Sequence, residues 1–270
     1  MEKWLKYSLS GLIILFVTIT SCNKVDEKPN QPDESEQLSL KRERYYQGSV
    51  YSQINYDALI TIEPNNAGIY QGKSIPHTKI GDYHIAFPLL EKAYELDPKE
   101  TGYYYGWLLL YYYRDYERAI KKLNEFDDFT PNQPDFAWGE HVNYLKGLCY
   151  KQMGQFDKAI DEFDKVIELE GDYVDVYAFV YRGICKMMLG FNKGAVVDFE
   201  KAIANYPNNS MAYFYLGMVH ERSGTQILSK KAYQNALRLL KKGFLNRDPY
   251  YEVFDAVSIE MVEDYLAKTP

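Results

Sequence analysis

Histidine, cysteine and carboxylate side chains are the groups in this sequence that could bind a metal or move a proton. The four histidines are dispersed, none forms a His-Glu-x-x-His motif, and we interpret them as surface residues: His77, His84, His141 and His220. The sequence has no GxSxG elbow, no phosphate-cradling GxxxxGK motif and no dinucleotide fingerprint. We therefore predict a protein that is not an enzyme, with no catalytic residue, no metal site and no cofactor.

The charge of the chain argues against nucleic acid as a partner. The formal net charge is -7, and no dense run of Lys and Arg is present to neutralise phosphates. The acids are spaced as on a solvated helix face, for example Asp157, Asp161 and Asp164. The sequence therefore favours a protein or peptide partner over a nucleic acid.

The first residues have the pattern of a targeting signal. Lys3 and Lys6 precede an apolar run from Gly11 to Ile19, which is too short to span a bilayer. The following "ITSC" resembles the lipobox of bacterial lipoproteins, in which the cysteine is acylated and the signal is cut before it. We predict a signal peptide at residues 1–21 and lipid attachment at Cys22; the alternative is an ordinary secretory signal followed by a chance cysteine.

The next stretch is too polar to bury a core. Residues 23–37, "NKVDEKPNQPDESEQ", contain a single apolar residue, two prolines and five acids. We predict that residues 22–38 form an acidic, disordered tether, which would span on the order of 20 Å between a membrane and the folded part.

Small residues and prolines recur with a period near 34. Pro64, Pro98 and Pro131 each close an apolar helical segment, because proline lacks the amide donor that a helix needs. A small residue recurs on the second helix of each repeat, at Ala86, Ala119, Ala159, Ala195 and Ser229. This periodicity predicts consecutive helical hairpins that expose the same face.

Two segments carry the full pattern, "GLCYKQMGQFDKAIDEFDKVIEL" from Gly147 and "GICKMMLGFNKGAVVDFEKAIANYP" from Gly183. Both resemble the tetratricopeptide repeat, in which the eighth residue is a small one where two helices cross. The resemblance implies an all-α fold, an α-solenoid of about five helix pairs over residues 67–243. The expected units are 67–100, 101–133, 140–173, 176–209 and 210–243, preceded by a degenerate N-terminal helical unit at 39–66 that would make a sixth pair.

A final helix is expected after the last repeat. Asp248 and Pro249 form a typical helix start, and Phe254, Met261 and Tyr265 follow at helical spacing. We interpret residues 244–270 as a capping helix that covers the apolar edge of the array; a partner-binding helix is the alternative.

Two units depart from the pattern. In the first, Ser74 replaces the crossing glycine and Pro76 lies within the helix, which should kink or fray. In the second, Leu108 occupies the glycine position, so its helices should lie further apart. Residues 134–139 are an insertion before the third unit.

Cys149 and Cys185 occupy the same position in adjacent units. Equivalent helices of neighbouring repeats lie roughly 9 to 10 Å apart, beyond the reach of about 7 Å for a disulfide. We therefore predict two free, buried thiols.

The family resemblance also implies where a partner binds, because the first helices of such units line a concave groove. Applied to this sequence it selects an aromatic and methionine-rich set, which suits a peptide or helix: Gln71, Lys79, Tyr105, Tyr112, Tyr113, His141, Tyr144, Lys151, Tyr177, Met187, Met188, Met211, Phe214, Met218, Glu221 and Arg222. These tyrosines could instead pack against neighbouring helices. The Lys and Arg clamp that grips acidic chaperone tails in some members is absent from the sequence.

The sequence thus predicts a membrane-anchored interaction scaffold in the bacterial cell envelope, with the outer membrane as the expected site. A cell-surface protein that captures glycans or peptides, and an immunity or inhibitor protein against a toxin, are the two alternatives.

Overall fold

The chain folds into thirteen α-helices within the residues described by the computed structural model, which are 33–131 and 135–269. The signal peptide, Cys22 and most of the tether lie outside these residues. The helices are α1 Glu34–Glu43, α2 Val50–Ile62, α3 Ala67–Ile80, α4 Tyr83–Leu96, α5 Pro98–Tyr111, α6 Tyr116–Asp127, α7 Val142–Gln152, α8 Phe156–Glu170, α9 Val176–Met188, α10 Asn192–Asn205, α11 Ser210–Arg222, α12 Gln226–Lys241 and α13 Ile259–Lys268.

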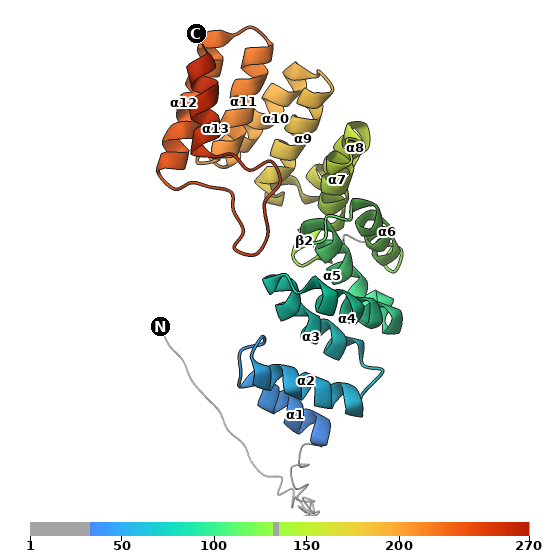
Figure 1. The fold of residues 1–270 in the computed structure, drawn as a ribbon. Helices are drawn as coiled ribbons and strands as arrows, with labels where there is room; N and C mark the ends of the chain where they lie inside the picture. The colour runs from blue at the N-terminus through green and yellow to red at the C-terminus, as the bar shows by residue number, and fades with distance from the viewer. Residues whose placement is uncertain (1–32, 132–134, 270) are drawn as a thin grey trace, which may run out of the picture.

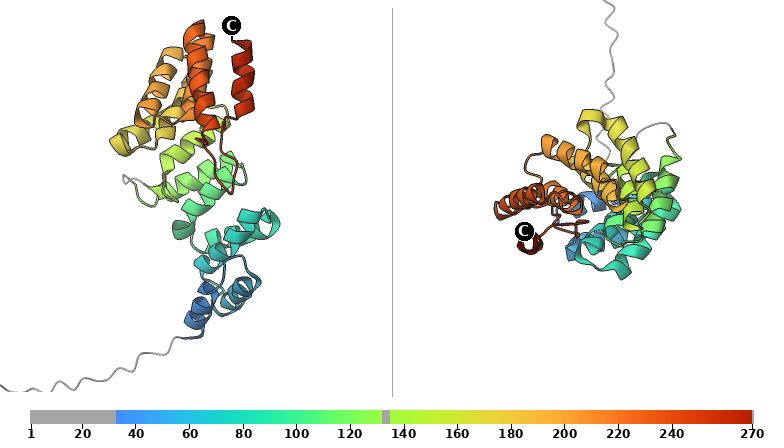
Figure 2. Two further views of the ribbon diagram at one scale, coloured as in Figure 1. Left: turned by 90° about the vertical axis from the view of Figure 1, so that its left-hand side faces the viewer. Right: turned by 90° about the horizontal axis from the view of Figure 1, so that it is seen from above.

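Successive helices form hairpins that stack in sequence order along a curved array (Figure 1). The first helices of the five predicted units are α3, α5, α7, α9 and α11, and each packs against the helix that follows it. Two views at right angles show the same stacking (Figure 2). The predicted all-α solenoid is therefore confirmed, and α1 with α2 forms a sixth hairpin at its N-terminal end.

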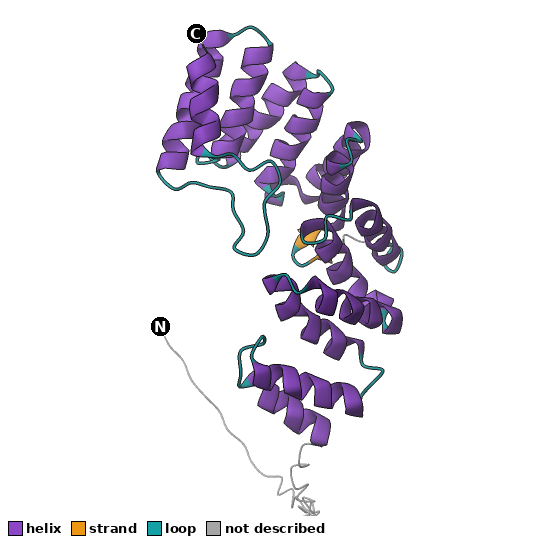
Figure 3. Cartoon of the chain, viewed as in Figure 1, coloured by secondary structure: helices purple, strands orange, loops and turns teal. Residues whose placement is uncertain are grey.

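Strand structure is minimal, as the colouring of Figure 3 shows. Strand β1 (Phe136–Ala137) pairs antiparallel with β2 (Glu140–His141) in the insertion before the third unit. A short 3-10 helix, Gly171–Tyr173, connects α8 to α9. None of the helices in the described residues is long and apolar enough to cross a lipid bilayer.

Local capping and turn chemistry explains where the hairpins begin and turn. The Asp97 carboxylate accepts a hydrogen bond of 3.0 Å from the Glu100 amide at the start of α5, and Pro98 occupies the first helical position, where no donor is missed. Between α9 and α10, Gly190 has a φ of 82°, a left-handed conformation that glycine adopts without a steric penalty.

A glycine lies where the two helices of a unit cross. A methyl group built on Gly183 would lie 2.8 Å from Cε1 of Phe199, and one on Gly147 would lie 2.8 Å from the ring of Phe163. The fully buried aromatic ring of the second helix therefore rests directly on the backbone of the first. These contacts, repeated along the stack, form one continuous hydrophobic core.

The second unit has its own crossing glycine, which corrects the prediction made from Leu108. Gly106 faces Leu123, and an added methyl group would lie 2.8 Å from its Cδ2 atom. Leu108 is instead fully buried in the core. The two helices of this unit meet at a glycine as in units three, four and five, and the sequence register predicted for it was wrong by two residues.

Pro76 does not end or fray α3, which continues to Ile80. Proline cannot donate to the carbonyl four residues earlier, which is that of Gly72. The Nε2 atom of Gln47 donates a hydrogen bond of 3.1 Å to this carbonyl instead. A side chain from the loop between α1 and α2 thus satisfies the acceptor, so the helix passes through the proline.

Both ends of the array differ from the predicted boundaries. Helix α1 begins at Glu34, so residues 34–38 are helical and do not belong to the tether. The C-terminal helix begins at Ile259, not at Asp248, and the chain from Phe244 to Ser258 has no helix or strand. We call residues 244–258 the C-terminal segment.

The first hairpin has a small core of its own. Tyr56 and Leu59 of α2 are buried against Ile69 of α3, with Leu38 and Ile60 packed around them. This cluster is separate from the main core, which begins at Leu90.

Candidate partner-binding surface

The C-terminal segment lies across the first helices of the units. It leaves α12, runs down toward the middle of the stack and returns to α13, where it forms the long red loop of Figure 1. Along this path it contacts residues from all five first helices. We call the surface of α3, α5, α7, α9 and α11 that it contacts the inner face.

Aromatic rings and cations dominate the half of the inner face built by units one and two. Tyr251 packs against Tyr111 with ring centroids 4.5 Å apart and meets the edge of Trp107 at 5.8 Å. The Tyr250 ring lies 4.7 Å from the Lys79 ammonium, a cation–π contact. The Arg114 guanidinium donates a hydrogen bond to the carbonyl of Glu252.

Phe254 and Asp255 reach furthest into the inner face. Phe254 is buried, stacks on Tyr111 at 5.7 Å and lies 4.2 Å beneath the Arg114 guanidinium carbon. Asp255 forms an ion pair with Lys151, whose side chain is only 4% exposed. The carboxylate thereby neutralises a cation that burial would otherwise penalise heavily.

Main-chain acceptors of the C-terminal segment complete the contact. The hydroxyl of Tyr181 on α9 donates to the carbonyl of Phe254 over 3.3 Å, and the hydroxyl of Tyr215 on α11 donates to that of Asp255, also over 3.3 Å. Burial raises the pKa of both tyrosines well above its usual value, so each hydroxyl keeps its proton and remains a donor.

The structure brings only some of the predicted groove residues to this contact. Lys79 contacts Tyr250, Tyr112 contacts Tyr251, and Lys151 pairs with Asp255. The Met211 sulfur accepts a hydrogen bond from Asn246 over 4.0 Å. Tyr144 is buried beside Tyr181, with ring centroids 6.2 Å apart. Gln71, Tyr177 and Met218 are partly buried on their helices, while Met188 is exposed.

Other predicted residues are used in packing between helices. Tyr105 and Tyr113 point toward the preceding hairpin, where both rings meet Phe87. Met187 is buried, its carbonyl accepts from Arg222, and Glu221 accepts from the Tyr233 hydroxyl over 2.8 Å. Phe214 is buried between Tyr233 and Tyr265, beneath the terminal helix α13.

His141 also differs from its predicted surface position. It is 4% exposed, and its Nδ1 atom accepts a hydrogen bond of 3.1 Å from the Asn143 amide, which caps α7. Burial lowers the pKa of its imidazole, so the neutral ring that accepts this bond is favoured. Its position is explained by helix capping.

Several residues of the inner face were missed by sequence reasoning. A register of unit two anchored on Gly106 places Trp107 and Tyr111 at the ninth and thirteenth positions, both of which line the surface in the family, so the correct glycine would have identified them. Tyr181 and Tyr215 share the sixth position of their units, which is not among the positions that the family resemblance selects. Arg114 lies in the turn after α5 and has no repeat signal.

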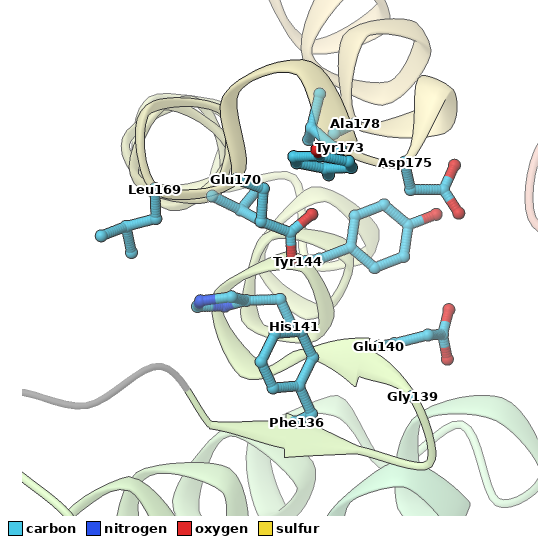
Figure 4. Close-up of a pocket in the computed structure, with 12 residues that line it drawn as sticks. Phe136, Gly139, Glu140, His141, Tyr144, Leu169, Glu170, Tyr173, Asp175 and Ala178 are labelled. Atoms are coloured by element: carbon cyan, nitrogen blue, oxygen red, sulfur yellow. The ribbon is translucent and has the colours of Figure 1, made fainter. Parts of the chain in front are cut away.

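A pocket of about 500 Å³ lies beside the inner face, between units three and four (Figure 4). Glu140, Tyr144 and Asp175 direct their polar ends to one side of it, and the buried His141 and the exposed Tyr173 also line it. Both oxygens of Glu140 are partnered, since Trp107 Nε1 and the Tyr111 hydroxyl each donate to it over 2.7 Å. Burial nevertheless raises the pKa of Glu140 to about 7.

Within the part of the chain that the structure describes, Cys149 and Cys185 are free and buried, as predicted. Burial raises the pKa of both thiols, to about 12 for Cys185, which disfavours the reactive thiolate. Within residues 33–131 and 135–269, no group of three His, Cys, Asp or Glu side chains is arranged to hold a metal ion.

Comparison with known families agrees with the repeat geometry. Models of the tetratricopeptide repeat match residues 142–173, which contain the α7/α8 hairpin, and residues 199–231. The chain therefore contains tetratricopeptide repeats. Among curated proteins, anaphase-promoting complex subunit 3 of Dictyostelium discoideum is 30% identical over 104 residues, which is 37% of this chain. The aligned part is only 10% of that subunit's length.

Solved tetratricopeptide-repeat structures share the fold. PilW, described as a type IV pilus biogenesis factor, superposes with a TM-score of 0.62 over 78% of this chain and 96% of its own, at 14% identity. MamA from Desulfovibrio magneticus RS-1 gives 0.57 over 66% and 96%, at 19% identity. YrrB, described as having an unusual peptide-binding site, gives 0.53 over 69% and 92%, at 18% identity. These likenesses show the fold alone.

Proposed function

We propose that the protein is a lipid-anchored scaffold of the bacterial cell envelope that binds a protein or peptide on its inner face. The observation that carries this proposal is that the first helices of all five units converge on a single stretch of irregular chain. A surface that already provides ring contacts, a buried cation and hydroxyl donors to such a chain has the groups needed to hold a peptide.

A recognition role without catalysis is supported by how the titratable groups are used. The most shifted carboxyl, Glu140, is bonded to Trp107 and Tyr111 within the fold. The buried Lys146 is paired with Asp127 over 2.6 Å, and the buried Asp198 is paired with Arg182 and Lys186. Structural bonding explains these groups without an acid–base role.

The anchor is proposed from the N-terminal sequence. Cys22 follows a short apolar signal and would carry the acyl chains, with the outer membrane as the proposed site. Cys22→Ala should remove incorporation of labelled palmitate and release the protein from the membrane fraction. Membrane retention of the Cys22→Ala variant would contradict this part of the proposal.

Partner binding can be tested with a photocrosslinking residue placed on the inner face in living cells. Tyr112 is partly buried beside Tyr251, whereas Lys201 on α10 is exposed and serves as the control position. We expect a defined crosslinked protein from position 112 and none from position 201. Equal crosslinking at both positions, or binding of an oligosaccharide with no protein crosslinked, would contradict the scaffold proposal.

A further inference from the structure

The C-terminal segment is longer than its connecting role requires. Helices α12 and α13 lie side by side, and Lys241 at the end of α12 pairs with Glu263 in α13 over 2.8 Å. The chain therefore leaves and returns at the same end of this helix pair (Figure 1), which a short turn could join. It instead takes residues 244–258 across the inner face and back.

Capping of the array does not depend on this excursion. Helix α13 covers α11 and α12 directly, with Val262 fully buried and the Tyr265 ring 5.2 Å from that of Phe214. The contacts of the C-terminal segment with the inner face are therefore separate from the capping contacts of α13.

The contacts of the C-terminal segment are those of a bound peptide. Its carbonyl groups at Glu252, Phe254 and Asp255 accept from side chains of the array, and main-chain carbonyls are present in a peptide of any sequence. Three side chains add selectivity: two aromatic rings at Tyr251 and Phe254, and the Asp255 carboxylate. Main-chain bonds with a few side-chain anchors are the usual division of labour in peptide recognition.

The third of these side chains, Asp255, is paired with the buried Lys151. Its ammonium lies 5.4 Å from the centre of the Tyr181 ring and is paired with Asp255. If the C-terminal segment leaves, this cation loses its carboxylate partner. An incoming ligand must therefore bring an acid to the same place.

Building on the proposed function, we propose that the C-terminal segment is an internal ligand that occupies the inner face and competes with the external partner for it. The external partner presents a peptide with an aromatic residue, a second aromatic residue three positions later and an acid directly after it. This peptide displaces residues 250–255 and takes over their contacts with Tyr111, Arg114 and Lys151. Gly243, with a φ of 88°, lies where the displaced segment would turn away from α12.

The test uses the chain from residue 23 to 270 and a fluorescent synthetic peptide, DPYYEVFDAV, which is the sequence of residues 248–257. The substitution pair Phe254→Ala and Asp255→Ala removes two anchors and frees the inner face. Because an occupied site weakens apparent affinity in proportion to the fraction that is open, we expect the pair to bind the peptide at least about tenfold more tightly than the wild-type chain. Fluorescence anisotropy measures the difference.

Two controls separate recognition from loosening of the fold. The side chain of Glu252 is exposed, and only the main-chain carbonyl of this residue contacts the array. Glu252→Ala leaves that carbonyl in place, so the peptide should bind this variant with the same affinity as the wild-type chain. Adding Lys151→Met to the variant with Phe254→Ala and Asp255→Ala should abolish the gain in affinity for the peptide. The gain should also be absent when the peptide itself carries Ala in place of Phe and Lys in place of Asp. Circular dichroism establishes that helix content is retained; should the pair unfold, Asp255→Lys alone expels the segment by repulsion from Lys151.

A released variant that binds the peptide no better than the wild-type chain, or whose binding survives Lys151→Met, would overturn this inference. The scaffold proposal would then still stand on its own evidence, because crosslinking from position 112 in cells does not depend on the synthetic peptide. The opposite outcome is no crosslink from position 112 in cells, together with the expected tighter binding of the peptide by the double variant. That outcome would contradict the scaffold proposal and would show only that the C-terminal segment binds the inner face of its own chain.

Discussion

Arg182 on α9 grips the Asp198 carboxylate on α10 with two hydrogen bonds, 3.0 Å from Nε and 2.5 Å from one terminal nitrogen. Asp198 is 1% exposed, and Lys186 also pairs with it over 2.8 Å. A second acid, Asp164 of the neighbouring hairpin, reaches the outer side of the same guanidinium but is 53% exposed. One buried and one exposed carboxylate thus share a single arginine.

We expect Asp198→Ala to lower the free energy of unfolding by about 3 kcal/mol, because it leaves Arg182 and Lys186 partly buried without their shared carboxylate. Asp164→Ala is the matched control and should cost less than about 1 kcal/mol, since an exposed ion pair contributes little. Urea denaturation followed by circular dichroism measures both. Equal losses in the two variants would show that burial of Asp198 does not govern the pair.

Gly183→Ala tests the close crossing of α9 and α10. The added methyl group would lie 2.8 Å from the fully buried Phe199 ring, so we expect a loss of about 1 to 3 kcal/mol from overpacking. Gly194→Ala is the control within α10, where the nearest atom is the flexible Lys186 Cδ at 3.3 Å. That variant should gain about 0.5 to 1 kcal/mol through helix propensity. Thermal melts that rank the two in the opposite order would contradict the packing argument.

Glu140 should make stability depend on pH. Its pKa is raised from 4.5 to about 7 in the folded chain, so the folded state keeps a proton that the unfolded state has lost in this window. Unfolding then releases a proton, and raising the pH from 4.5 to 7 should reduce the free energy of unfolding, by at most about 3 kcal/mol.

Glu140→Gln removes this titration, so the difference in stability between wild type and variant should change across the same window. Denaturation at a series of pH values measures it. A difference that stays constant between pH 4.5 and 7 would mean that Glu140 titrates normally.

The two buried thiols should react only when the fold opens. In the chain from residue 23, Cys149 and Cys185 should react with a thiol reagent at least about a hundredfold more slowly in the native protein than in denaturant, because both are buried with raised pKa values. Both should be titrated in unreduced, denatured protein. Prompt reaction of the native chain would contradict their burial.

The repeat pattern was sufficient to predict the solenoid because each hairpin is specified locally. Gly147 and Phe163 lie within one unit, and the left-handed turn at Gly190 follows its helix directly. Periodic sequence signals report such contacts. The error in unit two arose because its turn is longer: residues 112–115 separate α5 from α6, whereas three residues separate the paired helices of units three to five. The crossing glycine therefore lies earlier than the expected position of Leu108, at Gly106.

The inner face was less predictable because its contacts are distant in sequence. Asp248 does act as a local cap, since its carboxylate accepts from the amides of Tyr250 and Tyr251. The helix signal in the sequence was therefore real, but the next residues are held by rings and cations of units one to five. Tertiary packing overrides the local preference, and nothing in the spacing of residues 244–258 reveals it.

The separate core of the first hairpin has a mechanical consequence. Because the buried cluster of Tyr56, Leu59 and Ile69 is separate from the main core, α1 and α2 can open while the rest of the stack stays intact. With the proposed anchor at Cys22, such opening would convert about 30 folded residues into slack, at up to about 3.3 Å each when drawn taut. The N-terminal hairpin would then act as an extensible strap between a lipid surface and the face that holds the partner.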